Sequence, residues 1–574
     1  MTKLLRYLKD YRKESILSPL FKLLEASFEL FVPLVMAKII DVGIPNQDVS
    51  YIVKMCLLMV LLGVVGLVCS LTAQYYAAKA AVGFAASVRR DLFGHIQRFS
   101  YSELDTIGTS TLMTRMTSDI NQVQNGVNMF LRLFMRSPFI VFGAMVMAFT
   151  IDVQSASVFA VTIPVLLIVV FAVLLISIPL YKKVQSRLDR VLMMTRENLV
   201  GARVIRAFNK EEDEISQYEN AGNELKGVQL FVGRISALLN PVTYVMINVA
   251  IVALIWVGGI RVNLGSISQG DVVALINYMS QILIELVKLA NLIITLTKAI
   301  ACGNRIQGIF DTKSGMAEGS REPVQVQRTN KVVEFDHVGF AYQGAQEESL
   351  SGIHFTALRG QTIGIIGGTG AGKSSLVNLI ARFYDATSGR VLVDGVDVKD
   401  YPFHQLRGKI GMVPQKAVLF QGTIAENLRW GKRDATEAEM YRALETAQAR
   451  DFVEAKEKGL QTEVQQGGKN FSGGQKQRLT IARAVIRNPE ILILDDSASA
   501  LDYATDARLR KAIRRMDPDI TVFLVSQRAA TIQYADQIIV LDDGEMAGLG
   551  THQELLEHCE VYQEIYYSQF PKEA

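Results

Sequence analysis

The sequence predicts a helical membrane domain of six spans, followed by a soluble α/β domain that binds a nucleotide. Three observations predict this fold class. The chain has 574 residues, more than one hydrophobic core usually organises. Its long apolar segments are concentrated before about residue 300. A strand-like run that leads into a glycine-rich loop and a lysine follows at 362–375.

The six spans are predicted from segment length, since a transmembrane helix needs about 20 mainly apolar residues. Three segments carry no charged residue and are long enough: 55–78, 153–181 and 235–260. Three others are less regular. The segment 137–151 is short unless it extends back to residue 130, and 21–42 and 272–297 span only if they tolerate internal charges.

The loops predict the orientation. Lysine and arginine gather before the first predicted span and after the second, fourth and sixth, whereas the opposite loops are short and hold a single arginine. Because basic residues near a membrane stay in the cytoplasm, both termini are predicted inside. We expect a multi-pass protein of the plasma membrane with its soluble domain in the cytoplasm.

Two long excursions separate spans two and three and spans four and five. Their helical apolar spacing predicts that the membrane helices continue into the cytoplasm. Short segments at 102–108 and 201–210 suit brief helices at the tips. We expect Asp105 and Phe208 there to contact the soluble domain.

Three of the charged residues in the predicted spans, where ionisable groups are costly, share one depth. Glu29, Arg136 and Glu285 all lie roughly 20 to 22 Å from the presumed outer ends, at about 1.5 Å per residue. Opposite charges on spans one, three and six could therefore meet. The layer is either a set of structural ion pairs or a substrate site that favours cations.

The predicted domains are a membrane domain at 1–312, a polar linker at 313–330 and a nucleotide-binding domain at 331–574. In the last of these, the strand 362–366 runs into a G-x-x-x-x-G-K-S loop. Its backbone N–H groups and the following helix N-terminus suit phosphates, its lysine reaches the terminal phosphates, and its serine ligates Mg²⁺. The loop residues predicted to bind nucleotide are Gly367, Gly370, Gly372, Lys373, Ser374 and Ser375.

A second motif narrows the function. The run Phe471-Ser472-Gly473-Gly474-Gln475 precedes a buried strand, 491–495, that ends in Asp495. Here the chain resembles the ATP-binding cassette transporters, whose signature motif is LSGGQ. The resemblance implies an exporter-type membrane domain and a cassette with a RecA-like core and a helical subdomain. It also implies ATP and Mg²⁺ as cofactors.

The resemblance assigns further residues. Tyr342 would stack on adenine, Gln415 would sense Mg²⁺, Asp495 would hold Mg²⁺ through water, and Asp502 in Ser499-Ala-Leu-Asp would cross to another cassette. In this family two cassettes sandwich each ATP, so Ser472, Gly473, Gly474 and Gln475 would act on a partner's nucleotide. A dimer of two such chains is implied.

Two departures from the family pattern affect one chemical step. Asp496 stands where a catalytic Glu follows the Walker B Asp, and Gln527 stands where a switch His contacts the γ-phosphate. The shorter carboxylate withdraws a general base, and glutamine cannot become cationic. Phe471 for Leu and Gln466 for Glu are further departures near the signature. The pattern resembles the degenerate subunit of a heterodimeric bacterial exporter whose partner supplies the catalytic Glu and His.

The predicted function is ATP-driven export of amphipathic drugs or lipids by alternating access in a lipid bilayer. A net charge of +3 gives no sign of a nucleic-acid surface. Two alternatives stay open: an importer of metal chelates with the same fold, and a membrane protein whose ATP site is only a sensor. The four cysteines lack metal-ligand spacing and are expected to pack.

Overall fold

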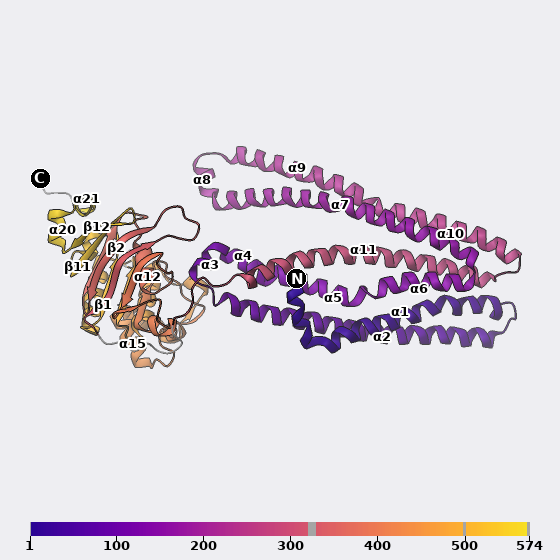
Figure 1. The fold of residues 1–574 in the computed structure, drawn as a ribbon, viewed down its shortest axis with the longest axis horizontal. Coiled ribbons are helices and arrows are strands. Elements are labelled where there is room, and N and C mark those ends of the chain that lie inside the picture. Colours follow the sequence, from indigo (N-terminus) through magenta and orange to yellow (C-terminus); the bar gives the residue numbers. More distant parts are fainter. Residues whose placement is uncertain (1, 320–328, 498–500, 571–574) are drawn as a thin grey trace. The chain divides into compact units, whose positions relative to one another are not determined.

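The computed structural model describes residues 2–319, 329–497 and 501–570. The chain divides into two compact units, which are described separately. The first comprises 1–97 and 110–312, and the second comprises 98–109 and 313–574. Figure 1 shows the elements of both units.

The first unit is entirely helical. Its 3₁₀ and π-helical segments are η1 (Thr2–Tyr11), η2 (Ile39–Gly43) and η3 (Arg115–Asp119). Its α-helices are α1 (Arg12–Lys38), α2 (Val49–Ile96), α4 (Thr109–Thr114), α5 (Ile120–Leu133), α6 (Arg136–Ile151), α7 (Val153–Val200), α8 (Ala202–Ala207), α9 (Glu211–Ala237), α10 (Leu239–Asn263) and α11 (Gln269–Asp311).

Short polar side chains cap the N-termini of the long helices, where they accept hydrogen bonds from backbone N–H groups that would otherwise be unpaired. Asp152 accepts from the backbone N–H of Ser155 at 2.8 Å at the start of α7. The same carboxylate forms an ion pair with Arg261 at 2.7 Å. Arg261 is the single arginine of the predicted outer loops. Ser268 and Asp271 form a reciprocal capping box at the start of α11.

The third predicted span is interrupted between α5 and α6. Pro138 lies in the first turn of α6 and has no N–H to offer the carbonyl of Phe134, so the helical hydrogen-bond pattern breaks at Phe134 and Met135, although their backbone angles stay helical. Extension of this span back to residue 130 therefore crosses a break.

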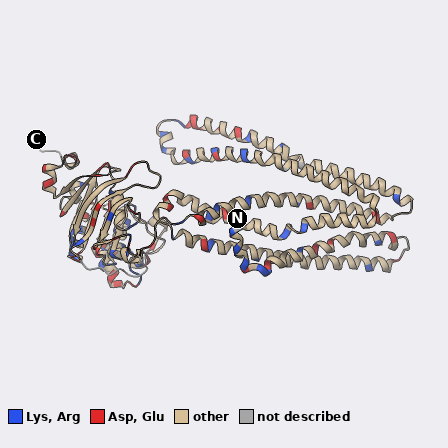
Figure 2. Ribbon diagram, in the orientation of Figure 1, with Lys and Arg blue, Asp and Glu red and all other residues tan. Residues whose placement is uncertain are grey.

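By length and composition, five helical segments in the described chain could cross a membrane: Val49–Ile96, Thr109–Ile151, Val153–Val200, Glu211–Asn263 and Gln269–Asp311. The first predicted span lies on α1 and η2 but is not among them, because Lys22, Glu25 and Glu29 interrupt it. A count of six spans thus stays a prediction. Figure 2 shows long stretches of α2, α7 and α10 without charged residues.

Two of the predicted spans continue well beyond the length of a span, as expected, while the cytoplasmic side of these extensions stays a prediction. Helices α2 and α7 are each 48 residues long, well beyond the roughly 20 that a span requires. Short helices also occur at both predicted tips: α3 (Tyr101–Ile107), which belongs to the second unit, and α8.

The described residues of the second unit form three sheets. A six-stranded sheet has the order β12-β11-β3-β10-β9-β6 and is parallel except at β12, and a four-stranded antiparallel sheet has the order β2-β1-β4-β5. The pair β7-β8 forms a third. The strands are β1 (Lys331–Phe340), β2 (Leu350–Leu358), β3 (Thr362–Gly367), β4 (Ser388–Val393), β5 (Val396–Asp397), β6 (Ile410–Val413), β7 (Gly422–Thr423), β8 (Glu463–Val464), β9 (Ile491–Asp495), β10 (Thr521–Val525), β11 (Gln537–Asp542) and β12 (Glu545–Gly550).

Helices flank and separate these strands. They are α12 (Lys373–Ile380), α13 (Phe403–Lys409), α14 (Ile424–Arg429), α15 (Glu437–Thr446), α16 (Arg450–Glu454), η4 (Gly459–Gln461), η5 (Gln466–Gly468), α17 (Gly473–Val485), α18 (Tyr503–Met516), α19 (Ala529–Ile532), α20 (His552–His558) and α21 (Glu560–Gln569). The predicted strands 362–366 and 491–495 are β3 and β9, whose every residue after Thr362 is buried. Such continuous apolar strands suit a central parallel sheet. Between β6 and β9 the chain is mainly helical, as the predicted helical subdomain requires.

Candidate nucleotide site and membrane charge cluster

The glycine-rich loop joins the end of β3 to the start of α12. Gly370 and Gly372 have φ of 89° and 87°, a left-handed region that glycine adopts without steric penalty. A side chain at residue 372 would also collide with the backbone oxygen of Ser349. The loop can therefore wrap closely around phosphates, with its N–H groups and the start of α12 available to anionic oxygens.

Lys373 supplies the cation of this loop. Its Nζ donates to the backbone oxygen of Gly367 at 3.0 Å and also to that of Gly368. Burial lowers the pKa of Lys373, while the nearby charges of Asp496 and Asp495 oppose that shift. The ammonium group of Lys373 therefore lies against the loop that is expected to bind the phosphates.

The predicted Mg²⁺ ligands meet beside the lysine. Ser374 Oγ donates to Asp495 Oδ1 at 3.1 Å, and Asp495 is 5% exposed. Burial raises the pKa of Asp495 above its ordinary value, although the Ser374 hydrogen bond acts against this. A hydroxyl and a carboxylate that share a buried position fit a hard cation such as Mg²⁺, which prefers oxygen ligands.

Asp496 follows directly after strand β9 in a left-handed conformation, with φ of 45°. Its N–H donates to the backbone oxygen of Val525 at 3.0 Å, and its side chain lines the same cavity as Gln415. Burial raises the pKa of Asp496, against the effects of Gln415, Arg528 and Lys373. Gln415 therefore favours the ionised form of the Asp496 carboxylate.

Gln527 lies after β10, in a segment that the last helix holds in place. The Nε2 of Gln569 on α21 donates to the backbone oxygen of Gln527 at 2.8 Å. The Oε1 of Gln569 accepts a hydrogen bond from the N–H of Ala529 at 2.9 Å. Gln569 was not predicted, because no local pattern indicates that a residue 42 positions away fixes this segment.

These residues surround one cavity of about 330 Å³. The predicted site residues that line it are Tyr342, Gly370, Gly372, Lys373, Ser374, Ser375, Gln415, Asp495, Asp496 and Gln527. Ser349, Thr369, Val525 and Ser526 complete the lining and were not predicted. Gly367 is placed at the site through its contact with Lys373.

Tyr342 stands at the edge of this cavity. Its hydroxyl lies 2.8 Å from Ser375 Oγ, and its ring packs edge to face against Phe340 and Tyr384. The residue is 36% exposed. Stacking of Tyr342 on adenine stays a prediction.

The signature residues do not line this cavity. Ser472 is the N-cap of α17 and accepts from the N–H of Gln475 at 3.3 Å, while Gly473 and Gly474 form the first turn. Ser472 and Gly473 are exposed. Asp502 is the N-cap of α18 and accepts a hydrogen bond from the backbone N–H of Thr505. Ser499 and Ala500, which precede it in the segment predicted to cross to another cassette, lie outside the described residues.

Helix α3 packs within the second unit, as predicted for Asp105. The hydroxyl of Tyr384 donates to Asp105 Oδ2 at 2.6 Å, and Tyr101 stacks on Phe383 with ring centroids 4.6 Å apart. In contrast, Phe208 at the end of α8 is 72% exposed, so its expected contact stays a prediction.

The predicted charge layer of the helical unit is confirmed. Arg136 bridges α1 and α11, with nitrogens 2.6 Å from Glu29 and 3.3 Å from Glu285. Glu285 also pairs with Lys288 at 2.7 Å and accepts from Ser137 at 2.8 Å. The two acids differ in access, because the side chain of Glu285 is 3% exposed and that of Glu29 is 40% exposed.

Two family descriptions match the chain. The ABC transporter transmembrane region matches residues 15–286, and the ABC transporter domain matches residues 350–499. The uncharacterized ABC transporter ATP-binding protein YfiB of Bacillus subtilis is 38% identical, over 100% of this chain and 99% of that protein.

Two further relatives have names that state an activity. YgaD of Bacillus subtilis, named as a candidate multidrug export ATP-binding/permease protein, is 31% identical over 99% of this chain and 98% of its own length. An ATP-dependent lipid A-core flippase of Chromobacterium violaceum is 28% identical over 99% of this chain and 97% of its own length. The solved structure of a bacterial Atm1-family ABC exporter with ATP bound shares the fold, with a TM-score of 0.81 over 98% of this chain and 99% of that one, at 24% identity.

Proposed function

The chain belongs to the ABC transporter family, and from that premise we propose that it acts as one half of a heterodimeric exporter of amphipathic substrates. It is an exporter-type half-transporter, with one transmembrane region and one ATP-binding domain. Such proteins are ATP-hydrolysing translocases of a membrane. The specific proposal is that this chain's own site binds ATP and hydrolyses it weakly.

The observation that carries the proposal is the contrast inside one cavity. Lys373, Ser374 and Asp495 hold the positions that bind phosphates and Mg²⁺, and Mg²⁺ would neutralise charge on the terminal phosphates there. Asp496 and Gln527 line the same cavity in place of a longer carboxylate and an imidazole. A general base must lie within hydrogen-bond reach of the attacking water, and the side chain of Asp496 is one methylene shorter than the glutamate expected there.

The exposed signature supports a second chain. Ser472 and Gly473 lie at the N-terminus of α17, away from the cavity that holds Lys373. A helix N-terminus with exposed N–H groups suits an anionic ligand from outside the chain. We infer that this surface completes the nucleotide site of a partner half-transporter, which supplies the catalytic Glu and the switch His.

The proposed organisation assigns residues 1–312 to the membrane domain, 313–330 to a linker and 331–574 to the nucleotide-binding domain. Both termini and the nucleotide-binding domain face the cytoplasm of a cell whose plasma membrane holds the protein. The excess of basic residues in the predicted inner loops supports this orientation. Relatives named for lipid A-core and multidrug export support an amphipathic substrate, drug or lipid.

The test uses the purified chain without a partner. It should bind ATP in a fluorescent-nucleotide titration and hydrolyse it slowly, and Lys373→Ala should remove the binding. Brisk hydrolysis by the isolated chain, strongly reduced in Asp496→Asn, would contradict the weak site. Substrate flux into inverted vesicles that contain the paired complex supports export, whereas flux in the opposite direction or none contradicts it.

A further inference from the structure

A β-bulge in the four-stranded sheet places three ligand-type side chains on one exposed face. Along β1 and β2, Phe335 pairs with Phe355 and Val338 pairs with Ile353. Asp336 and His337 together therefore oppose the single residue His354. Between the buried Phe335 and Val338, the two intervening side chains both lie away from the core.

The bulge depends on an unusual backbone conformation. His337 has φ of 48°, a left-handed value that a residue with a Cβ adopts only at a steric cost. On the neighbouring strand β4, a side chain at residue 389 would collide with the backbone oxygens of Asp336 and His337, so Gly389 makes room for the bulge. In a regular strand the side chains of Asp336 and His337 would lie on opposite faces of the sheet. The bulge places both side chains on the same face.

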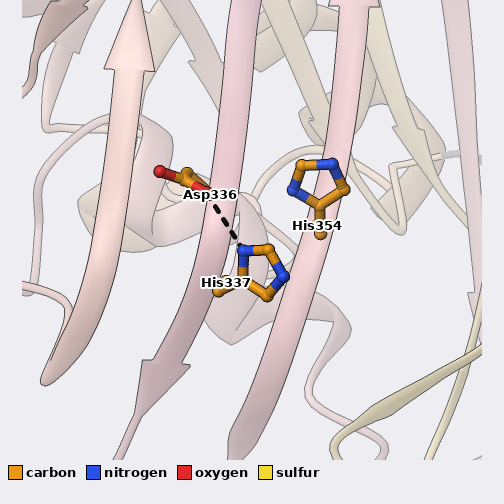
Figure 3. A group of neighbouring side chains, drawn as sticks. All are labelled: Asp336, His337 and His354. Atoms are coloured by element: carbon orange, nitrogen blue, oxygen red, sulfur yellow. Dashed lines mark hydrogen bonds and ion pairs between the residues drawn. The ribbon is translucent and has the colours of Figure 1, made fainter.

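The three side chains lie close together in Figure 3, where Asp336 and His337 come from one strand and His354 from the next. One ligand atom from each residue lies within 4.8 Å of the others. His337 Nδ1 is 3.1 Å from Asp336 Oδ1, and the two imidazole rings have centroids 4.9 Å apart. Within the described ranges no other cluster of three such residues is as close.

The donor set selects a class of ion. Two imidazole nitrogens and one carboxylate oxygen suit Zn²⁺ and neighbouring divalent transition ions, whereas Mg²⁺ and Ca²⁺ prefer oxygen ligands alone. Ligand bonds to Zn²⁺ are about 2.0 to 2.2 Å long, so the side chains must turn inward on binding. Both imidazoles are exposed, which leaves them room to turn.

One neighbour competes for the carboxylate. Arg390 on β4 lies 3.3 Å from Asp336 Oδ2, in an exposed ion pair. The opposite oxygen, Oδ1, faces His337 and not the guanidinium. Exposed ion pairs are weak, so Arg390 should lower the affinity for a cation without closing the site.

We propose that Asp336, His337 and His354 form a binding site for one divalent transition metal ion, with Zn²⁺ held by these three ligands and by water. The ion would cross-link β1 to β2. These strands lead to Tyr342 and Ser349, which both line the nucleotide cavity, so the ion would stiffen one wall of that cavity. The proposal does not depend on the direction of transport or on a partner chain.

The test measures Zn²⁺ binding to the full chain, purified without a polyhistidine tag and free of nucleotide, by competition with a fluorescent chelator at about pH 7.5. One site should be lost or weakened about tenfold or more in His354→Ala, Asp336→Asn and His337→Asn. Asparagine at residue 337 tolerates the left-handed backbone, so this variant removes the imidazole alone. His404→Ala, at another exposed histidine of the same unit, should bind as the unaltered chain does.

Two further measurements sharpen the result. Arg390→Gln should bind Zn²⁺ several-fold more tightly, because it releases the carboxylate of Asp336 from its ion pair. Millimolar Mg²⁺ should not displace the ion. If the chain binds no Zn²⁺ in the micromolar range, or if His354→Ala and His404→Ala bind it equally, the site does not exist.

Discussion

Asp496 and Gln527 are single-residue departures whose effect can be tested by reversing them. Glutamate at residue 496 lengthens the carboxylate by one methylene, about 1.5 Å, and histidine at 527 restores a group that can become cationic. Asp496→Glu combined with Gln527→His should raise ATP hydrolysis by the isolated chain about tenfold or more. Steady-state phosphate release at saturating ATP measures this rate.

A matched control changes the same residue types elsewhere in the ATP-binding domain. Asp542→Glu combined with Gln553→His alters exposed positions that do not line the cavity, and its rate should stay at the starting value. If the restored variant binds ATP but hydrolyses it no faster than this control, the two departures do not limit the chemistry.

Glu285 and Glu29 contact the same arginine but should respond differently to neutralisation. Glu285 is buried between Arg136, Lys288 and Ser137, and removal of one partner from a buried ion pair costs about 3–5 kcal/mol. Glu285→Gln should therefore lower the thermal midpoint clearly in detergent. Glu29 is partly exposed, and Glu29→Gln should cost about 1 kcal/mol or less.

The same pair separates structure from substrate recognition. If Glu29 faces a substrate cavity, Glu29→Gln should slow transport of cationic substrates more than neutral ones while the thermal midpoint is kept. Equal transport of both classes would leave the cluster with a structural role only. A lower midpoint for Glu29→Gln than for Glu285→Gln would contradict the assignment of the buried acid as the structural one.

At the scale of elements, α3 carries the contact between Asp105 and Tyr384. Tyr384→Phe removes one hydrogen bond and keeps the ring that packs against Phe340 and Tyr342. We expect basal ATP hydrolysis by the paired complex to persist and its stimulation by substrate to fall severalfold. Tyr503→Phe, at an exposed tyrosine, is the control and should behave as the unaltered complex.

Helix α8 offers the complementary test, because Phe208 at its end is 72% exposed. Aromatic side chains, Phe included, are enriched at the buried centres of protein interfaces, and the predicted contact would cover this ring. Phe208→Ala should separate ATP hydrolysis from transport, so that flux falls while hydrolysis continues. Phe231→Ala, at an exposed residue of α9, should keep both. Normal flux and normal substrate stimulation in Phe208→Ala would refute the contact.

At the scale of the whole molecule, the sequence predicted those features that depend on local pattern. Continuous apolar strands, the glycine-rich loop and the lengths of α2 and α7 follow from periodicity and composition, which act over short stretches. The meeting of Glu29, Arg136 and Glu285 was also predictable, because membrane depth can be counted from helical rise.

Features set by distant residues could not be predicted in this way. Gln569 holds the segment of Gln527 from the last helix, and the bulge at His337 depends on Gly389 of a neighbouring strand. The break before α6 has a local cause in Pro138, yet an apolar segment around it reads as continuous. The partners of the charged residues in α1 likewise come in part from other helices, since Lys22 donates to Ser70 and Arg136 pairs with Glu25 and Glu29.

In the proposed assembly, different residues of this chain serve two different nucleotides. Asp496 lies in the cavity of this chain's own glycine-rich loop, so Asp496→Asn should change ATP hydrolysis by the paired complex only modestly. Ser472 caps α17 at an exposed end that, in the proposed dimer, faces the partner's ATP. Ser472→Arg should therefore nearly abolish hydrolysis, although Ser472 does not line this chain's own cavity. The variant inside the cavity is thus expected to have the smaller effect on ATP hydrolysis, and the variant outside the cavity is expected to have the larger one.

Steady-state ATP hydrolysis by the paired complex in lipid nanodiscs measures both effects, with ATP binding to each variant as the control for folding. Two ordinary sites in a homodimer would lose most of their activity in both variants, since each chain would supply a base and a signature. A protein that only senses ATP would have little hydrolysis to lose in either. A large loss in Asp496→Asn together with a small loss in Ser472→Arg would contradict the asymmetric assembly, because catalysis would then depend on this chain's own carboxylate and not on its signature helix.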